Sequence, residues 1–131
     1  MFAAEPAAVS PADCAEGDHY GLQVRASDDS NFYLFGISCD GRARAQLVSN
    51  GKYTVLISLD SDPVIQTGDR SINVLAVRAV DNTFDFYANG KLLASFSNNT
   101  HPGGKLGLYA RAVSAGELSV SFDNISAWNA P

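Results

Sequence analysis

The carboxylates of this 131-residue chain are the first candidates for chemistry, because a glycoside hydrolase needs two of them close together. The three glutamates, Glu5, Glu16 and Glu117, are scattered along the sequence. Most aspartates fall in expected turns, where their side chains bond to nearby backbone amides. Asp85 lies inside an expected strand, but its alternation with two flanking phenylalanines points it to solvent. We therefore predict no paired-carboxylate centre.

Nucleophilic and metal chemistry have no better support in the residue spacing. The two histidines, His19 and His101, lie at the end of the N-terminal segment and in a Pro-Gly-Gly turn. Neither accompanies a G-x-S-x-G elbow, and no P-loop or GxGxxG motif occurs. Two cysteines without a CxxC pair do not supply a zinc site. We predict no catalytic residue, no metal site and no cofactor.

Calcium is the one ion for which loop carboxylates are available. Asp28 with Asp29, and Asp60 with Asp62, offer the hard oxygen ligands that calcium prefers. Their spacing matches no EF-hand loop. We favour ordinary solvated turns at these positions, with calcium binding as the alternative.

Another set of residues suits binding rather than catalysis. Aromatic rings pack against the apolar C–H patches of sugars, and planar polar groups bond to sugar hydroxyls. Strand alternation places several such side chains outward, with Arg42 and Arg44 nearby. The alternative is that the tyrosines pack across strands and the arginines keep the face soluble. The candidate ligand-binding residues are Gln23, Arg25, Tyr87, Tyr109 and Arg111.

Composition excludes several classes of partner. Fourteen Asp and Glu against nine Lys and Arg give a formal net charge of −5. Nucleic acids and anionic membranes are bound by clustered cations, so we expect neither partner. No apolar run approaches the ~20 residues of a membrane-spanning helix. With 46% hydrophobic and 18% charged residues, the chain is expected to fold as one domain with a core.

Turn residues and short alternating segments indicate the elements that carry these side chains. Asp40–Gly41, Asn50–Gly51 and Asn89–Gly90 favour two-residue hairpin turns, because these residue types adopt positive φ readily. No window shows a capped helical stripe. About nine strands indicate an all-β fold, an antiparallel β-sandwich or jelly roll. The expected strands cover residues 20–25, 32–38, 42–48, 52–59, 71–80, 84–88, 91–97, 105–111 and 117–128.

The N-terminal segment and the cysteines bear on where the chain works. Residues 1–19 are Ala-rich, are interrupted by Pro6 and Pro11, and are expected to form an arm before a sandwich domain over residues 20–131. The arm lacks the basic start and apolar core of a signal peptide. Cys14 and Cys39 flank strands, which favours a disulfide stabilising by about 3–4 kcal/mol in an oxidising compartment. Two reduced, buried cysteines are the alternative.

Several segments together form a recognisable pattern: Tyr20–Arg25, Asp29–Ser38, Phe86–Gly90, Gly104–Leu108 and Val120–Ile125. Over about residues 20–128 they resemble the concanavalin A-like lectin/glucanase superfamily. The similarity is to bacterial extracellular modules related to 3-keto-disaccharide hydrolase domains and to laminin-G-like domains. That superfamily usually has further strands before the first of these segments, one of which pairs with the closing strand. The resemblance implies that the arm replaces this strand poorly, that the chain is a fragment, or that a partner supplies the strand.

The resemblance and the outward residues together predict a non-catalytic extracellular module that binds carbohydrate on an exposed sheet face. One alternative is a structural or interaction subunit of a surface assembly, with another protein subunit as its partner. A second alternative is a hydrolase-like domain acting on a 3-keto-disaccharide. The absence of a paired-carboxylate motif argues against the hydrolase.

Overall fold

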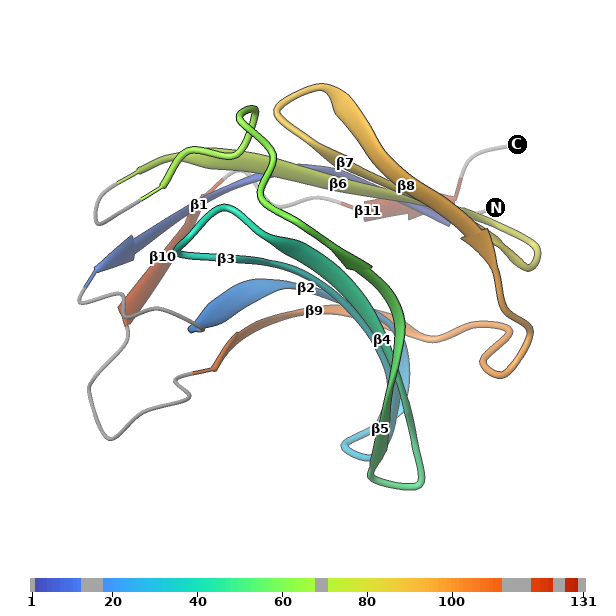
Figure 1. Cartoon of the computed structure of the whole chain (residues 1–131). Coiled ribbons are helices and arrows are strands. Elements are labelled where there is room, and N and C mark those ends of the chain that lie inside the picture. Colours follow the sequence, from blue (N-terminus) through green and yellow to red (C-terminus); the bar gives the residue numbers. More distant parts are fainter. Residues whose placement is uncertain (1, 13–17, 68–70, 112–118, 124–126, 130–131) are drawn as a thin grey trace.

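The chain folds into two stacked antiparallel β-sheets, shown in Figure 1. This computed structural model describes residues 2–12, 18–67, 71–111, 119–123 and 127–129, with side chains described within 18–67 and 71–111. The described residues form eleven strands and no helix, which confirms the all-β sandwich prediction. The strands are β1 (Phe2–Ala12), β2 (His19–Asp28), β3 (Asn31–Ser38), β4 (Ala43–Ser49), β5 (Lys52–Leu59), β6 (Asn73–Val80), β7 (Thr83–Ala88), β8 (Lys91–Ser97), β9 (Lys105–Arg111), β10 (Ser119–Asp123) and β11 (Ala127–Asn129).

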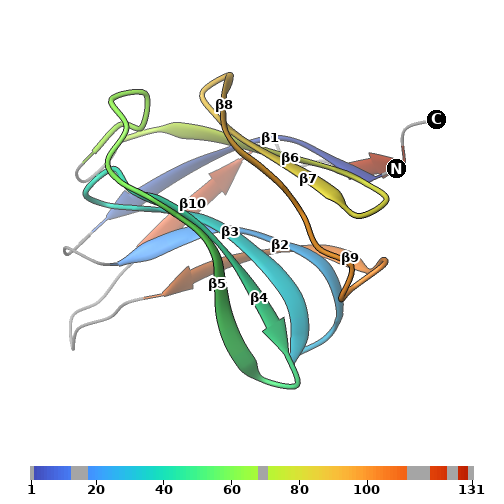
Figure 2. The ribbon, with the colours of Figure 1, turned by 45° about the vertical axis from the view of Figure 1, so that its right-hand side comes forward.

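The two sheets differ in shape and in strand order. One sheet has five strands in the order β5-β4-β3-β2-β9. The other has six, in the order β10-β1-β6-β7-β8, with β11 also pairing with β1. In Figures 1 and 2 the five-stranded sheet bends away from its partner, so its outer face is concave. We call this outer surface the concave face.

The hairpin turns lie where the sequence predicts them. Asn50 and Gly51 connect β4 to β5 with φ angles of 52° and 78°, and Asn89 and Gly90 connect β7 to β8 with 51° and 84°. Positive φ at both central residues matches the right-handed twist of the flanking strands. Gly41, with φ 87°, follows Asp40 between β3 and β4. These turns fix the register, and the register decides which side chains reach the concave face.

The inward faces of both sheets form one hydrophobic core. It is rich in aromatic rings, and those of Phe35, Phe84 and Phe96 are stacked or tilted with centroids 5.4–5.8 Å apart. Tyr33 packs against Phe84 at 4.6 Å, and its hydroxyl donates to Oδ1 of Asn98 at 2.6 Å. Every residue of Phe32–Ser38 is buried, as expected for a central strand covered on both sides. The core therefore anchors β3, the strand at the centre of the concave face.

Two connections cross between the sheets and are held by polar side chains. The segment between β5 and β6 is one of them, and Asn73 holds it by donating to the carbonyl of Gln66 and accepting from its amide. Asn89 donates to the carbonyl of Val64 in the same segment. The segment between β8 and β9 is held by His101, whose Nε2 donates to the carbonyl of Val48 at 2.8 Å. These contacts fix the ends of β5 and β9.

Two predictions about the chain ends are corrected by the structure. Residues 2–12 are not an arm outside the sandwich: they form β1, which pairs with β6, β10 and β11. The strand place thought to be missing is therefore filled by the chain itself, and the domain boundary at residue 20 is wrong. The single strand predicted over residues 117–128 is two strands, β10 and β11, which accounts, with β1, for eleven strands rather than nine. Alanine and proline composition concealed β1, because neither residue favours strands.

The disulfide stays a prediction. Cys14 lies outside the described residues. Cys39 is buried at the end of β3, and its amide donates to the carbonyl of Asp18 at 3.2 Å. No helix among the described residues is long and apolar enough to cross a membrane.

Candidate ligand-binding face

Register across the five-stranded sheet places one set of polar side chains on the concave face. His19 of β2 is opposite Ser38 of β3 and Arg111 of β9. Two positions further along, Gly21 is opposite Gly36 and Tyr109. Residues of one parity on paired strands share a face. The described members of the concave face therefore include His19, Gly21, Gln23, Leu34, Gly36, Ser38, Arg44, Gln46, Ser58, Tyr109 and Arg111.

Two glycines make room for Tyr109 on this face. A Cβ at Gly36 would lie 1.8 Å from the Tyr109 hydroxyl oxygen, so this ring crosses β2 and ends over β3. Gly21 of β2 lies between Tyr109 of β9 and Gly36 of β3, and it has no side chain to block the Tyr109 ring. The ring is only partly exposed, and burial raises the pKa of the Tyr109 hydroxyl. Tyr109 is thus held flat on the sheet instead of projecting into solvent.

His19 contacts Tyr109 and is close enough to Arg44 and Arg111 to be influenced by their charges. Its Nδ1 is 3.2 Å from the Tyr109 hydroxyl, and the two rings meet edge to face at 5.5 Å. Burial first, and then the nearby charges of Arg44 and Arg111, lower the pKa of His19 to about 4 against a smaller opposing effect of Asp18. His19 is therefore neutral at pH 7. A neutral imidazole offers one donor and one acceptor, which suits a hydroxyl-bearing ligand.

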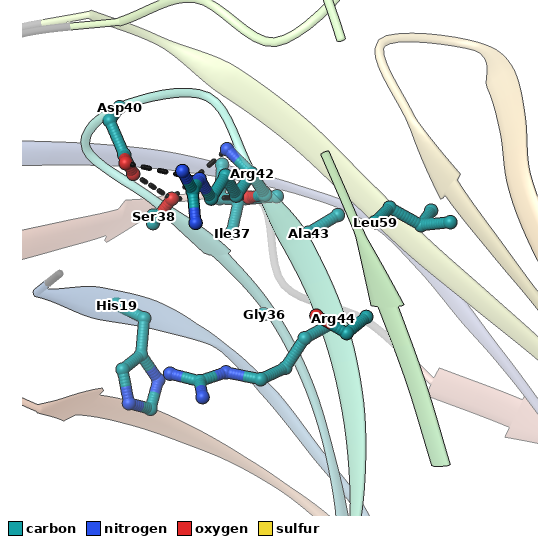
Figure 3. A pocket seen from close by; sticks show the side chains of 10 residues that line it. His19, Gly36, Ile37, Ser38, Asp40, Arg42, Ala43, Arg44 and Leu59 are labelled. Atoms are coloured by element: carbon teal, nitrogen blue, oxygen red, sulfur yellow. Dashed lines mark hydrogen bonds and ion pairs between the residues drawn. The ribbon is translucent and has the colours of Figure 1, made fainter. Parts of the chain in front are cut away.

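A pocket of about 260 Å³ opens beside His19, as Figure 3 shows. Arg44 extends across it from β4, and its guanidinium ends next to the imidazole of His19. The remaining walls come from β3, the β3–β4 turn and β5. The lining residues are His19, Gly36, Ile37, Ser38, Asp40, Arg42, Ala43, Arg44, Ser58 and Leu59.

The β3–β4 turn forms a rigid rim to this pocket. The hydroxyl of Ser38 donates to Oδ1 of Asp40 and accepts from the amide of Arg42. The Arg42 guanidinium pairs with the Asp40 carboxylate at 3.4 Å. Each carboxylate oxygen of Asp40 therefore has a partner within the turn.

The rest of the concave face is an apolar bed. Phe32, Leu34 and Val48 point to this side of the sheet, yet they are almost fully buried and pack with Tyr109 as a second cluster. Tyr53 of β5 meets Phe32 edge to face at 6.5 Å. The guanidinium of Arg111 lies 5.3 Å from the centre of the Tyr53 ring. Since β9 and β5 are the two edges of the sheet, this contact bridges the concave face.

The structure places only some of the predicted candidate residues on one face. Gln23, Tyr109 and Arg111 lie together on the concave face, with Arg44 beside them. Tyr87 does not join them, because β7 belongs to the other sheet, where Tyr87 is opposite Ala76. Alternation gives the parity of a side chain but does not state to which sheet a strand belongs.

Arg25 is the clearest error in the predicted site. It is 4% exposed and points inward: its guanidinium lies 4.8 Å from the centre of the Phe84 ring and donates to the carbonyl of His101 at 3.3 Å. Arg25 has a φ of 55° at a β-bulge, where the pairing of β2 shifts on both sides. A bulge adds one residue and reverses the alternation after it. Arg25 is therefore a core residue, not a ligand-binding residue.

His19, Ser38 and Gln46 also lie on the concave face, although they were not among the candidate residues predicted from the sequence. His19 was placed at the end of an arm instead of the start of β2. Gln46 lies on the same face of β4 as Arg44; it is 7% exposed and its Oε1 has no partner among the described residues. The glycines at positions 21 and 36 were the available signal, because a strand glycine often marks a close approach.

The loop carboxylates behave as turn residues. Asp28 accepts from the amide of Ser30 at 2.8 Å and from the Asn31 side chain at 2.9 Å. Asp62 accepts from the amide of Val64 and pairs with Lys91 at 2.8 Å. Within the described ranges, no group of three or more His, Cys, Asp or Glu residues could hold a metal ion. The calcium alternative remains an untested prediction.

Comparison with known proteins finds similar solved structures but no matching family. No protein-family description and no curated protein matches the chain. Carbohydrate-binding module CBM66 from Bacillus subtilis is similar with a TM-score of 0.77 and 18% identity, over 98% of this chain and 74% of that one. Toad ovary galectin in complex with thio-digalactose gives 0.67 and 14%, over 97% and 89%. The fold is therefore a β-sandwich like that of these two proteins.

A similar sandwich also forms part of a much longer chain. The GH43 BlXynB protein from Bacillus licheniformis is similar with a TM-score of 0.62 and 14% identity, over 96% of this chain but only 27% of that one. At such identities the likeness establishes architecture, and function depends on the residues of the site.

Proposed function

We propose that this chain is a non-catalytic carbohydrate-binding module whose ligand sits on the concave face, in and beside the pocket at His19. The observation that carries this proposal is the convergence of His19, Ser38 and Arg44 around a pocket on a bent sheet. These side chains supply donors and acceptors for hydroxyl groups, and Tyr109 and Tyr53 supply aromatic surface nearby. The pocket, about 260 Å³, is smaller than the ~300–1,000 Å³ of sites that enclose drug-sized ligands. It suits one sugar ring or the end of a longer chain.

The comparisons support a saccharide ligand. One similar structure is a carbohydrate-binding module, and another is a galectin in complex with thio-digalactose. Both share the β-sandwich fold of this chain, so the fold is compatible with such a ligand. The specific residues of the concave face, not the shared fold, would decide which sugar this chain takes.

The arrangement of carboxylates supports a binding role over hydrolysis. A retaining glycosidase holds two carboxyl groups about 5 Å apart, and an inverting enzyme holds them about 6.5–9.5 Å apart. Among the ten lining residues Asp40 is the one acidic side chain, and it is bonded to Ser38 and Arg42. Asp18, next to His19, is 1% exposed.

A pair of matched substitutions tests the proposal. Ser58 lines the pocket from β5, and Ser95 occupies a comparable exposed place on β8 of the other sheet. We expect Ser58→Tyr to fill the pocket and weaken glycan affinity by about tenfold or more. Ser95→Tyr should leave it unchanged. The measurement is a glycan array followed by calorimetric titration of the bound glycans.

Three results are informative. Selective loss in Ser58→Tyr supports the proposed face. Equal affinity in both variants and the parent chain would move the site elsewhere on the molecule. The absence of binding to any arrayed glycan, and to polysaccharides at millimolar concentration, would overturn the proposed function.

A further inference from the structure

Two arginines, Arg44 of β4 and Arg111 of β9, lie on the concave face. The Arg44 guanidinium ends beside His19, as Figure 3 shows, and the Arg111 guanidinium lies over the Tyr53 ring. No described acidic side chain forms an ion pair with either guanidinium; the described ion pairs are Arg42 with Asp40 and Lys91 with Asp62. The chain has fourteen acidic residues against nine basic ones, so this local excess of positive charge runs against the composition.

The neighbouring titratable groups report this positive field. Arg44 and Arg111 both lower the pKa of His19 and both act to lower the pKa of the Tyr109 hydroxyl, although burial dominates each shift. Asp18 is the acidic residue that acts on His19, and its opposing effect is the smallest of the four contributions. Two cations on one surface repel each other. An anion between them would relieve that repulsion.

The surroundings of the two arginines favour an anion carried by a larger polar molecule. Arg111 rests on the Tyr53 ring, which orients its guanidinium over the face. On the same face of β4, next after Arg44, Gln46 is 7% exposed with an unpartnered Oε1. A buried acceptor of this kind gains from a donor such as a hydroxyl. Chloride and sulfate have no hydroxyl to offer, whereas a saccharide carries several.

We propose that the ligand is an acidic saccharide, whose carboxylate or sulfate ester is bound by Arg44 and Arg111 while its hydroxyls bond to the neutral polar groups of the face. This inference rests on the proposed carbohydrate-binding function and specifies its ligand class. A guanidinium presents two parallel N–H donors that match both a carboxylate and a sulfate. His19, uncharged at pH 7, adds hydrogen bonding without adding charge.

The experiment compares acidic and neutral glycans on one array of the intact chain. The array carries uronic-acid, sialic-acid and sulfated glycans together with neutral ones. Each acidic glycan that binds is then titrated beside its carboxyl-reduced or desulfated counterpart. We expect affinity to fall about 10- to 100-fold when the charge is removed, and to weaken as salt rises.

Matched arginine variants assign the effect to the concave face. Arg44→Gln and Arg111→Gln should each reduce affinity for the acidic glycan by a larger factor than affinity for its neutral counterpart, because a neutral amide keeps hydrogen bonding but loses the charge. Arg78→Gln is the control, because Arg78 is exposed on β6 of the other sheet. An unfolding curve for each variant shows that folding is unchanged.

The outcomes separate this inference from the proposed function. Preference for acidic glycans that is lost in Arg44→Gln and kept in Arg78→Gln supports it, and the nature of the preferred glycans distinguishes carboxylate from sulfate. Neutral glycans bound as tightly as acidic ones would overturn the inference and leave the proposed function standing. Absence of all glycan binding would overturn both.

Discussion

Tyr109 and Tyr87 both point away from the core, yet they lie in opposite surroundings. Tyr109 of β9 crosses two glycines, bonds to His19 and lies beside two arginines. Tyr87 of β7 is opposite Ala76 on one side and Leu92 on the other, on the outer face of the six-stranded sheet. Tyr109 belongs to the candidate ligand-binding face, whereas Tyr87 packs on the outer face of the other sheet.

The difference shows that outward parity is necessary but not sufficient for a binding site. On the six-stranded sheet, cross-strand neighbours with side chains support one another and leave an even surface. On the five-stranded sheet, glycines and a bend allow long side chains to lie down across neighbouring strands. A site therefore arises where small residues let polar and aromatic groups from several strands converge.

The largest effect is expected from adding a side chain at Gly21, where β2 lies close to β3. A Cβ at Gly21 would lie 2.1 Å from the carbonyl oxygen of Phe35, which is backbone and cannot move aside. We expect Gly21→Ala to destabilise the fold by about 3 kcal/mol in denaturant unfolding. Gly103→Ala is the control, since nothing lies within 4 Å of the added atom. Equal stabilities of the two variants would show that the strands are not this close.

An intermediate effect is expected from Arg25, the arginine that the bulge turns into the core. Arg25→Ala loses the contact with the Phe84 ring and the bond to the carbonyl of His101. We expect a loss of about 2–3 kcal/mol in the free energy of unfolding, with glycan affinity retained in the folded protein. Arg44→Gln should show the reverse pattern. Loss of affinity in Arg25→Ala at a temperature where it is fully folded would contradict the distinction between these two arginines.

The smallest effect concerns pH. The pKa of His19 falls from 6.5 to about 4 on folding, because of burial and then Arg44 and Arg111, with Asp18 opposing. Below pH 6.5 the unfolded chain binds the proton first, so stability that is present above pH 6.5 is lost as pH falls towards 4. We expect the melting temperature to drop by about 3–6 °C across this interval.

His19→Gln isolates this contribution. The variant keeps a polar side chain but cannot titrate, so its melting temperature should vary less between pH 6.5 and 4 than that of the parent chain. Acidic residues common to both proteins contribute equally and cancel in the comparison. Parallel pH profiles would show that His19 is free to protonate in the fold.

Much of the fold followed from local chemistry. Asn50–Gly51 and Asn89–Gly90 made their hairpins predictable, because few residue pairs adopt the required backbone. The site was predictable only in part, with Gln23, Tyr109 and Arg111 on one face as expected. Arg25 was misplaced because a bulge is set by pairing on both sides of β2, which local alternation does not contain.

The sequence by itself determined the all-β character, the hairpin turns and the alternation of side chains along strands without a bulge, since these depend on neighbours one or two residues away. The tertiary structure alone decided that residues 2–12 form a strand beside β6 and β10, and that Tyr87 and Tyr109 lie on different sheets. It also decided that Arg44 and Arg111, 67 positions apart in number, share one surface. Such meetings depend on strand order and sheet curvature, which arise from burial summed over the whole chain.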